Sequence, residues 1–216
     1  MDMSGSVRWW WVRHAPVTGQ DGKLYGAADV DCDVSDALSF KGLASLLPAD
    51  AVWLTSHLSR TRKTAAAIFD AGLDAPLPRP VPELAEQNFG RWQGLSWQEM
   101  ERKQPDVYKK FWQSPADNAP PGGESFAGQI HRVGRVIEQT TAENNALDIV
   151  AVAHGGTIRA AIAHALQLPA IDAMSFRIDT LSVTRLDYVK GGLLKGQGGS
   201  WRIHCVNQSA KPVVSS

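Results

Sequence analysis

The chain has 216 residues, of which 44% are hydrophobic and 20% charged, a balance typical of a soluble globular protein. Lys and Arg together number 22, as do Asp and Glu, so the formal net charge is zero and no general attraction to polyanions is implied. Nucleic acids and anionic membrane surfaces are therefore not expected as partners.

The N-terminal apolar run is only a few residues long and lies between arginines, too short for a secretory signal or a membrane span. A cytoplasmic location is therefore expected. Cys32 and Cys205 are far apart and show no CxxC spacing, so neither a disulfide framework nor a zinc site is indicated. Both thiols are expected to be reduced.

Strands and helices alternate along the chain. Short runs rich in β-branched or aromatic residues predict buried strands at 7–12, 51–56 and 148–154. Helical patterns cover 36–47, 60–71, 124–144 and 157–166, and the first of these is expected to be capped by Ser35. This alternation predicts a three-layer α/β/α sandwich with a mainly parallel central sheet.

Residues 1–216 are predicted to form a single domain, with a partly helical insertion at about 87–122 over one end of the sheet. The tryptophans of this insertion, Trp92, Trp97 and Trp112, are expected to pack it. An aromatic wall for a ring-bearing substrate is a less favoured alternative. The glycine-rich stretch 190–200 lacks the order of a phosphate-binding P-loop and is interpreted as a hairpin loop.

Reactive side chains follow each of the three predicted strands. The first strand ends in Arg13 and His14, the second leads to Arg60, and the third is followed by His154 and Gly155. In open α/β sheets, ligands bind beyond the carboxyl ends of the strands. If the strands are neighbours in a parallel sheet, these side chains converge on one pocket.

Such a pocket suits phosphate. Arginine offers a planar fork of donors that matches phosphate oxygens and stays charged. The turn after His154 also leads into a predicted helix N-terminus at Thr157, where free N–H groups favour an anion. An Arg-His pair at a strand end and a His-Gly-Gly turn are each more often structural than functional. Their joint occurrence at three strand ends favours a functional site.

Five motifs occur in order between residues 12 and 159: "VRHA", "SHLSRTRKTA", "LAEQNFGRWQG", "PGGES" and "AHGGTIR". In order and spacing this series resembles the histidine phosphatase superfamily, the phosphoglycerate mutase-like proteins. The resemblance implies a phosphoglycerate mutase-like fold. It also implies that His14 is the nucleophile and becomes a phosphohistidine, while Arg13, Arg60 and His154 hold the phosphoryl oxygens.

The same resemblance implies that Glu86 is the proton donor and later the general base. Glu83, three residues earlier, is a rival carboxylate, but Gly90 and Gly94 follow Glu86 at the spacing of the family. Glu83 is therefore expected to have a structural role or to support the residues that contact the substrate.

The loop after the first histidine departs from the family pattern, because Ala15 and Pro16 replace its usual Gly-Glu-Thr or Gly-Gln-Thr. Thr18 is expected to supply the missing hydroxyl one position late, and Gly155 to lie against the substrate. His57 is either a residue of the pocket rim or an exposed loop histidine.

The resemblance implies a metal-independent and cofactor-independent phosphomonoesterase acting on a small phosphorylated metabolite. Because the insertion is short and ends in "PGGES", the chain looks more like the small-molecule phosphatases, such as alpha-ribazole phosphatase, than like the mutases. A phosphoglycerate mutase and a non-catalytic module that binds phosphorylated ligands remain as alternatives. A homodimer is also left open.

Overall fold

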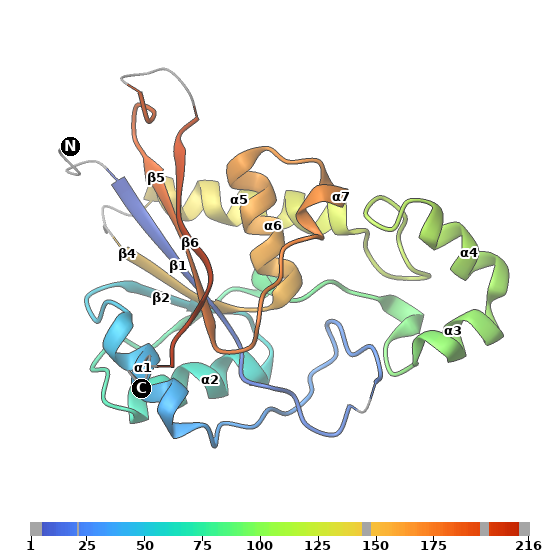
Figure 1. The fold of residues 1–216 in the computed structure, drawn as a ribbon, viewed down its shortest axis with the longest axis horizontal. Helices are drawn as coiled ribbons and strands as arrows, with labels where there is room; N and C mark the ends of the chain where they lie inside the picture. The colour runs from blue at the N-terminus through green and yellow to red at the C-terminus, as the bar shows by residue number, and fades with distance from the viewer. Residues whose placement is uncertain (1–5, 21, 144–147, 195–198, 212–216) are drawn as a thin grey trace, which may run out of the picture.

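The computed structural model describes residues 6–20, 22–143, 148–194 and 199–211. Within these residues one six-stranded sheet forms the centre of the fold (Figure 1). Its strands in chain order are β1 (Ser6–Arg13), β2 (Val52–Thr55), β3 (Arg79–Pro80), β4 (Asp148–Ala153), β5 (Ser182–Val189) and β6 (Trp201–Ser209).

The spatial order of the strands is β3-β2-β4-β1-β5-β6. The strands from β3 to β1 in this order are parallel, whereas β5 and β6 are antiparallel to their neighbours. The prediction of a mainly parallel sheet is confirmed. Since β2, β4 and β1 are adjacent, their carboxyl ends lie together at one edge.

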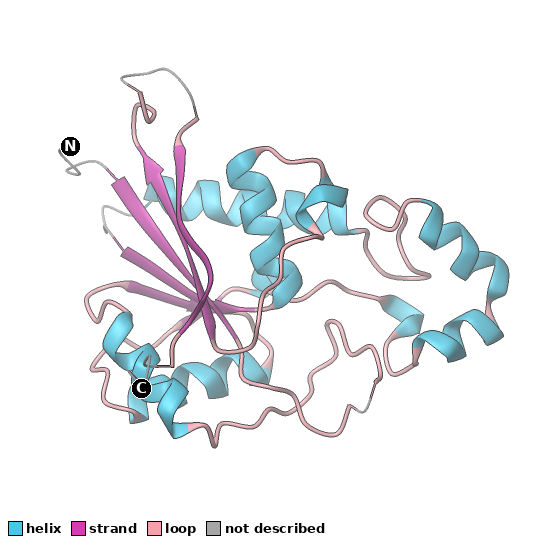
Figure 2. Cartoon of the chain, viewed as in Figure 1, coloured by secondary structure: helices cyan, strands magenta, loops and turns pink. Residues whose placement is uncertain are grey.

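Helices cover both faces of this sheet, which confirms the three-layer sandwich (Figure 2). Helices α1 and α2 pack on one face, and α5 and α6 on the other. The helical elements are α1 (Ala37–Leu46), α2 (Ser59–Asp70), η1 (Pro82–Leu84), η2 (Gly90–Trp92), α3 (Trp97–Lys103), α4 (Pro105–Gln113), α5 (Phe126–Glu143), α6 (Gly155–Leu166) and α7 (Ala170–Ala173).

The tryptophans of β1 explain why this strand is buried. Trp9 and Trp11 belong to the core between the sheet and helices α5 and α6, where their rings stack at 5.1 Å between centroids. Trp10 alternates to the opposite face and packs against the other core. Burial of one such ring contributes on the order of 5 kcal/mol of hydrophobic free energy. The strand is thereby anchored up to its end at Arg13.

The start of α1 differs by one residue from the prediction, because Asp36 rather than Ser35 is its N-cap. An Asp36 carboxylate oxygen accepts the Ser39 N–H at 3.1 Å. A carboxylate at this position satisfies an unpaired N–H and complements the helix dipole. Ser35 precedes the cap, and its N–H donates to Asp33.

Two strands near the C-terminus were not predicted, although the loop between them was. Strands β5 and β6 are consecutive and pair antiparallel, which agrees with the interpretation of 190–200 as a hairpin loop. Residues 195–198 of that stretch lie outside the described part.

The segment 87–122 contains η2, α3 and α4 and extends away from the sheet (Figure 1). It has a small core of Trp92, Met100 and Phe111. Trp97 and Trp112 lie against each other, with ring centroids 5.6 Å apart, and remain 37% and 45% exposed. Trp92 is therefore a packing residue, whereas the other two tryptophans lie partly at the surface.

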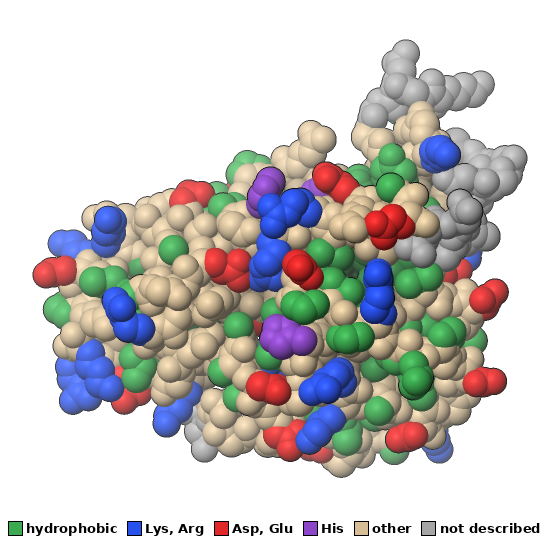
Figure 3. Space-filling model, turned by 180° about the vertical axis from the view of Figure 1, so that it is seen from behind, with side chains coloured by type: hydrophobic (Ala, Val, Ile, Leu, Met, Phe, Trp, Pro, Cys, Tyr) green, Lys and Arg blue, Asp and Glu red, His purple; other side chains and the backbone are tan. Residues whose placement is uncertain are grey.

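On the face shown in Figure 3, side chains of both charge signs are interspersed, in keeping with the zero formal net charge. Within the described residues no helix has both the length and the apolar character required to cross a membrane.

Candidate active site

The strand ends bring the two histidines together. Arg13 is the last residue of β1 and pairs in register with Ala153, the last residue of β4. His14 and His154 follow directly, with their ring centroids 5.1 Å apart. Arg60, in the first turn of α2 after β2, donates a hydrogen bond to His154. The convergence predicted from the three strand ends is therefore present in the structure.

The imidazole of His14 is held in one tautomer. Its Nδ1 lies 2.7 Å from the carbonyl oxygen of Ala15, and because a carbonyl can only accept, Nδ1 carries the hydrogen. The Nε2 atom therefore bears a lone pair, and it is buried without a hydrogen-bond partner among the described residues. Burial lowers the pKa of His14 to about 3, and the nearby charges of Arg60 and Arg13 act in the same direction. At neutral pH His14 is a neutral imidazole.

This shift predicts that stability falls in mild acid. Because the folded-state pKa lies below the unfolded value of 6.5, the unfolded chain binds a proton that the folded chain does not. Stability is retained above pH 6.5 and is lost as the pH falls towards 3. One such histidine contributes about 1.4 kcal/mol per pH unit. Urea unfolding at several pH values between 7.5 and 5 measures this slope.

The variant His14→Asn should show a shallower slope than the parent protein. His131→Asn is the matched control, because His131 is exposed on α5 and lies outside the site. A parental slope in the His14 variant would refute the assignment.

Arg60 is buried completely and bonded at several atoms. Its Nη1 and Nη2 donate to the carbonyl oxygens of Ala28 and Gly26, both at 2.7 Å, and its Nε donates to Nδ1 of His154 at 3.2 Å. The guanidinium also lies over the ring of Tyr25 at 5.1 Å. Burial lowers the pKa of Arg60, but a guanidinium remains charged. It therefore places a fixed positive charge beside His14.

His154 supports Arg60 through one ring nitrogen and contacts Ser56 through the other. Because a guanidinium can only donate, Nδ1 of His154 carries no hydrogen and Nε2 donates to the Ser56 hydroxyl at 2.8 Å. Burial lowers the pKa of His154 well below its usual value, and the neighbouring His14 and Arg60 add to the effect. Ser56 was not predicted as a site residue, although it is the first residue of the motif "SHLSRTRKTA" that contains Arg60.

Arg13 is held by the loop before β5. Its Nη1 donates to the carbonyl oxygen of Ile178 at 2.5 Å, whereas its Nε is buried without a partner in the described structure. Gly155 lies against this side chain, since a Cβ at this glycine would be 3.4 Å from Arg13 Nε. An unpaired donor and the unpaired lone pair of His14 thus occur in one site. This combination suits an electrophile that carries negative charge.

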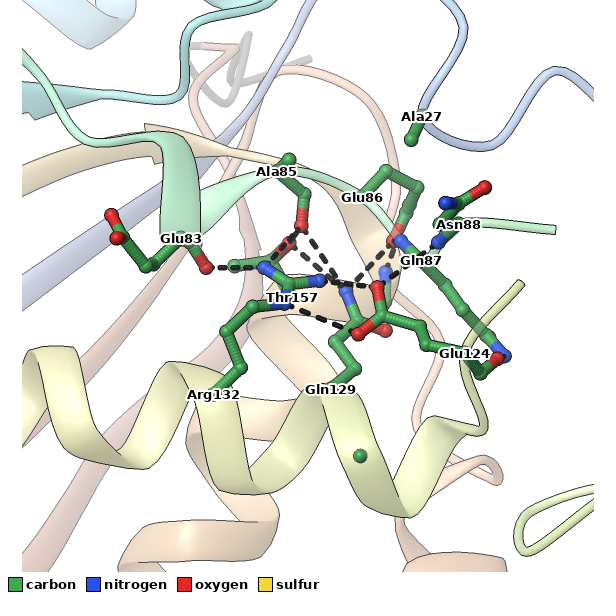
Figure 4. A network of polar contacts seen from close by, with 12 residues as sticks. Ala27, Glu83, Ala85, Glu86, Gln87, Asn88, Glu124, Gln129, Arg132 and Thr157 are labelled. Atoms are coloured by element: carbon green, nitrogen blue, oxygen red, sulfur yellow. Dashed lines mark hydrogen bonds and ion pairs between the residues drawn. The ribbon is translucent and has the colours of Figure 1, made fainter. Parts of the chain in front are cut away.

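Glu86 follows η1 and approaches the N-terminus of α6 (Figure 4). Its Oε2 accepts the Gly156 N–H at 3.1 Å, and its Oε1 accepts the Gln87 N–H at 2.9 Å. Glu83, in contrast, is exposed, and its backbone carbonyl accepts from Arg132. The carboxylate that meets the helix N-terminus is therefore that of Glu86.

Thr18 and His57 lie at the surface. Thr18 is exposed, and the contact described for it joins its N–H to the carbonyl oxygen of Asp31. His57 is exposed in the turn before α2. It contributes to the lowering of the pKa of His154. Ala15, at the position of the usual family glycine, is buried, and its N–H donates to the Thr64 hydroxyl at 2.9 Å.

Arg159 was not singled out from the sequence. It ends the motif "AHGGTIR" on α6, and its Nε donates to the carbonyl oxygen of Phe176 at 2.7 Å. Burial lowers the pKa of Arg159, while the charge of Glu86 raises it and that of Arg13 lowers it. Arg159 is therefore a third arginine near the site. Its position at the end of the motif "AHGGTIR" is the sequence feature that could have identified it.

Among the described residues, no group of three or more His, Cys, Asp and Glu side chains is arranged to hold a metal ion. The positive charge of the site comes from its arginines.

The fold and site define an α/β sandwich that presents a neutral histidine nitrogen and arginines at the carboxyl ends of parallel strands. The model of the histidine phosphatase superfamily (branch 1) matches residues 9–196. The chain belongs to this superfamily, and the prediction of an enzyme of the histidine phosphatase class is confirmed.

Two curated relatives are phosphatases. The chain is 29% identical to an adenosylcobalamin/alpha-ribazole phosphatase of Salmonella typhimurium over 86% of this chain and 92% of the relative. It is 32% identical to a metal-independent phosphoserine phosphatase of Arabidopsis thaliana over 69% of this chain and 64% of the relative.

Solved structures share the fold. The alpha-ribazole phosphatase of Shigella flexneri superposes with a TM-score of 0.80 at 24% identity, covering 97% of this chain and 100% of that one. A mycobacterial glucosyl-3-phosphoglycerate phosphatase superposes with a TM-score of 0.78 at 22% identity, covering 94% and 100%. The expected phosphoglycerate mutase-like fold is confirmed.

Proposed function

We propose that the protein is a phosphomonoesterase that acts on a small phosphorylated metabolite through a phosphohistidine on His14. The observation that carries this proposal is the buried lone pair of His14 Nε2, which has no partner in the described structure and lies in a site that also contains the unpaired Nε of Arg13. A phosphoryl group supplies what both atoms lack, an electrophilic phosphorus and acceptor oxygens.

In the first step, the lone pair of His14 Nε2 forms a bond to phosphorus and the bond from phosphorus to the ester oxygen breaks. The neutral carboxyl of Glu86 gives its proton to the departing oxygen, so that an alcohol leaves. Arg13 and Arg60 stabilise the negative charge on the phosphoryl oxygens in the transition state. The Nδ1–H bond to Ala15 stabilises the positive charge that the ring acquires on phosphorylation.

In the second step, water attacks phosphorus and the nitrogen–phosphorus bond breaks. The carboxylate of Glu86 takes a proton from that water, which restores the neutral acid and the free lone pair of His14. The net reaction is hydrolysis of a phosphomonoester to an alcohol and phosphate, without an external oxidant or reductant.

The substrate class is a small polar phosphomonoester. The relatives described above carry the names of phosphatases for ribazole phosphate, phosphoserine and glucosyl-3-phosphoglycerate, which share only the phosphomonoester group. We assign this shared chemistry to the chain and take ribazole phosphate as the first compound to test. A phosphate-transferring mutase and a non-catalytic binding module are outcomes of the same experiment.

The test incubates the protein with a panel of ³²P-labelled phosphomonoesters and follows free phosphate and acid-labile phosphoprotein. Release of phosphate together with labelled protein, both absent in His14→Asn, is the expected result. Labelled protein that passes its phosphate to a second substrate rather than to water would indicate a mutase. Binding without label or release would overturn the proposal in favour of a binding module.

A chelator is expected to leave the rate of phosphate release unchanged, because arginines provide the positive charge around the phosphoryl group. Assays with and without EDTA, after dialysis against the chelator, measure this directly. Loss of activity that a divalent cation restores would show that a metal takes part in the reaction.

A further inference from the structure

Gln129 lies on α5, is buried completely and points at the Glu86 carboxylate (Figure 4). We infer that Gln129 is a positioning residue that holds Glu86 in place to protonate the leaving group. This inference rests on the proposed function, in which Glu86 is the general acid.

The orientation of the Gln129 amide follows from its neighbours. Its Nε2 lies 3.2 Å from Glu86 Oε1, 3.4 Å from the carbonyl oxygen of Ala85 and 3.3 Å from the Thr157 hydroxyl. The Thr157 hydroxyl itself donates to backbone carbonyls, including that of Ala85 at 3.0 Å. Because all three neighbours of the amide offer oxygen acceptors, the amide must present its NH₂ group to them.

The three donors to the Glu86 carboxylate among the described residues differ in where they are fixed. The Gln87 N–H belongs to the segment of Glu86 and moves with it. The Gly156 N–H and the Gln129 amide are attached to α6 and α5, which pack against each other and against the sheet. These two contacts therefore set where the carboxylate lies relative to His14.

Packing alone does not account for a glutamine at this position. The Oε1 atom of Gln129 is buried and has no hydrogen-bond partner among the described residues. A buried amide oxygen without a partner is unfavourable, and an apolar residue of similar size would avoid this cost. The donor side of the amide, which faces Glu86, offers the reason for its presence.

The experiment uses the dependence of the reaction on the leaving group. An alkyl phosphate needs a proton on its departing oxygen, whereas 4-nitrophenyl phosphate releases a stable phenolate without help. Because kcat/KM reports the steps up to departure of the leaving group, a misplaced Glu86 lowers it for the alkyl ester alone. A general defect in folding lowers it for both esters.

Gln129→Met keeps the size of the side chain and removes the amide. We expect kcat/KM to fall about 10- to 100-fold for an alkyl phosphate and less than about 3-fold for 4-nitrophenyl phosphate. Arg132→Met is the matched control, because Arg132 holds the same segment through Glu124 and backbone carbonyls without touching the Glu86 carboxylate. Equal losses for both esters, or no loss, would overturn the role of Gln129.

Gly156→Ala tests the position of the same carboxylate through helix α6. A Cβ at Gly156 would lie 2.2 Å from Glu86 Oε1 and 3.0 Å from Gln129 Oε1. The carboxylate must therefore move and the Gln129 amide must adjust, whereas the fold should persist because both atoms end flexible side chains. The same dependence on the leaving group is expected. Gly128→Ala is the control, because its Cβ would meet only Ser125 Oγ, at 3.4 Å.

Together, Gly156→Ala and Gln129→Met also separate the inference from the proposed function. If Gly156→Ala shows the dependence on the leaving group and Gln129→Met does not, the role of Gln129 is refuted and that of Glu86 stands. If neither variant shows it and His14→Asn remains active, the proposed function itself fails.

Discussion

Replacement of His14 by alanine is expected to lower kcat/KM for phosphomonoester hydrolysis by about 10⁴-fold or more and to abolish the acid-labile phosphoprotein. The imidazole supplies the only unpaired nitrogen lone pair among the buried atoms of the described site, and its neutral form is ensured by burial between two arginines. Alanine leaves the arginines in place, so phosphate binding should persist while turnover stops. Initial rates and isothermal titration with inorganic phosphate measure the two effects separately.

His131→Ala is the matched control for this experiment, because His131 is exposed on α5 and should keep parental activity. Circular dichroism spectra of both variants establish that the fold persists. Activity of the His14 variant within tenfold of the parent would rule out covalent catalysis at this residue.

The parts of the fold that could be predicted are those whose burial is visible in one short stretch. Strand β4 is buried along its whole length, and β1 has buried residues on both of its faces. Both appear in the sequence as continuous apolar runs, which is typical of parallel strands. Reactive residues directly after such runs must lie at the carboxyl edge of the sheet. This geometry is why Arg13, His14 and His154 could be placed together without a structure.

Strand β5 escaped prediction because it buries charge. Asp187 is almost fully buried within it and pairs with Arg185 at 2.8 Å, while the Arg185 guanidinium lies over the ring of Trp10. A sequence pattern treats these charged residues as solvent-exposed, since the partners that make their burial tolerable become adjacent only in the folded sheet. Strand β6 is partly exposed along its length, so it shows no apolar run.

Gln129 and Ser56 could not be assigned to the site from the sequence, because their partners are distant along the chain. Gln129 lies 43 positions from Glu86 along the chain, and Ser56 lies 98 positions from His154. An isolated glutamine on a helix or serine after a strand has no spacing that reveals such a contact. Their roles depend on tertiary structure. Arginines and histidines directly after buried strands, in contrast, are unusual enough in sequence to indicate a functional site.

Replacement of Arg60 is expected to damage stability and catalysis together. Arg60→Ala would leave the carbonyl oxygens of Gly26 and Ala28 and the Nδ1 of His154 without their donor, next to the completely buried ring of His154. Loss of several buried hydrogen bonds to a charged group should cost about 3–5 kcal/mol of unfolding free energy. Activity should fall at least about 10³-fold, because a principal positive charge beside the phosphoryl group is removed.

Arg60→Lys separates these two effects, since it keeps the charge and loses the planar fork of donors. A single ammonium cannot reach both carbonyls and His154 while also contacting a phosphoryl oxygen. We expect a smaller loss of stability than in the alanine variant but still about a 10²-fold loss of kcat/KM. Arg62→Lys, exposed on the same helix, is the control for both urea unfolding and kinetics. Parental kcat/KM in Arg60→Lys would show that charge alone suffices and that the bonded network around the guanidinium has no part in catalysis.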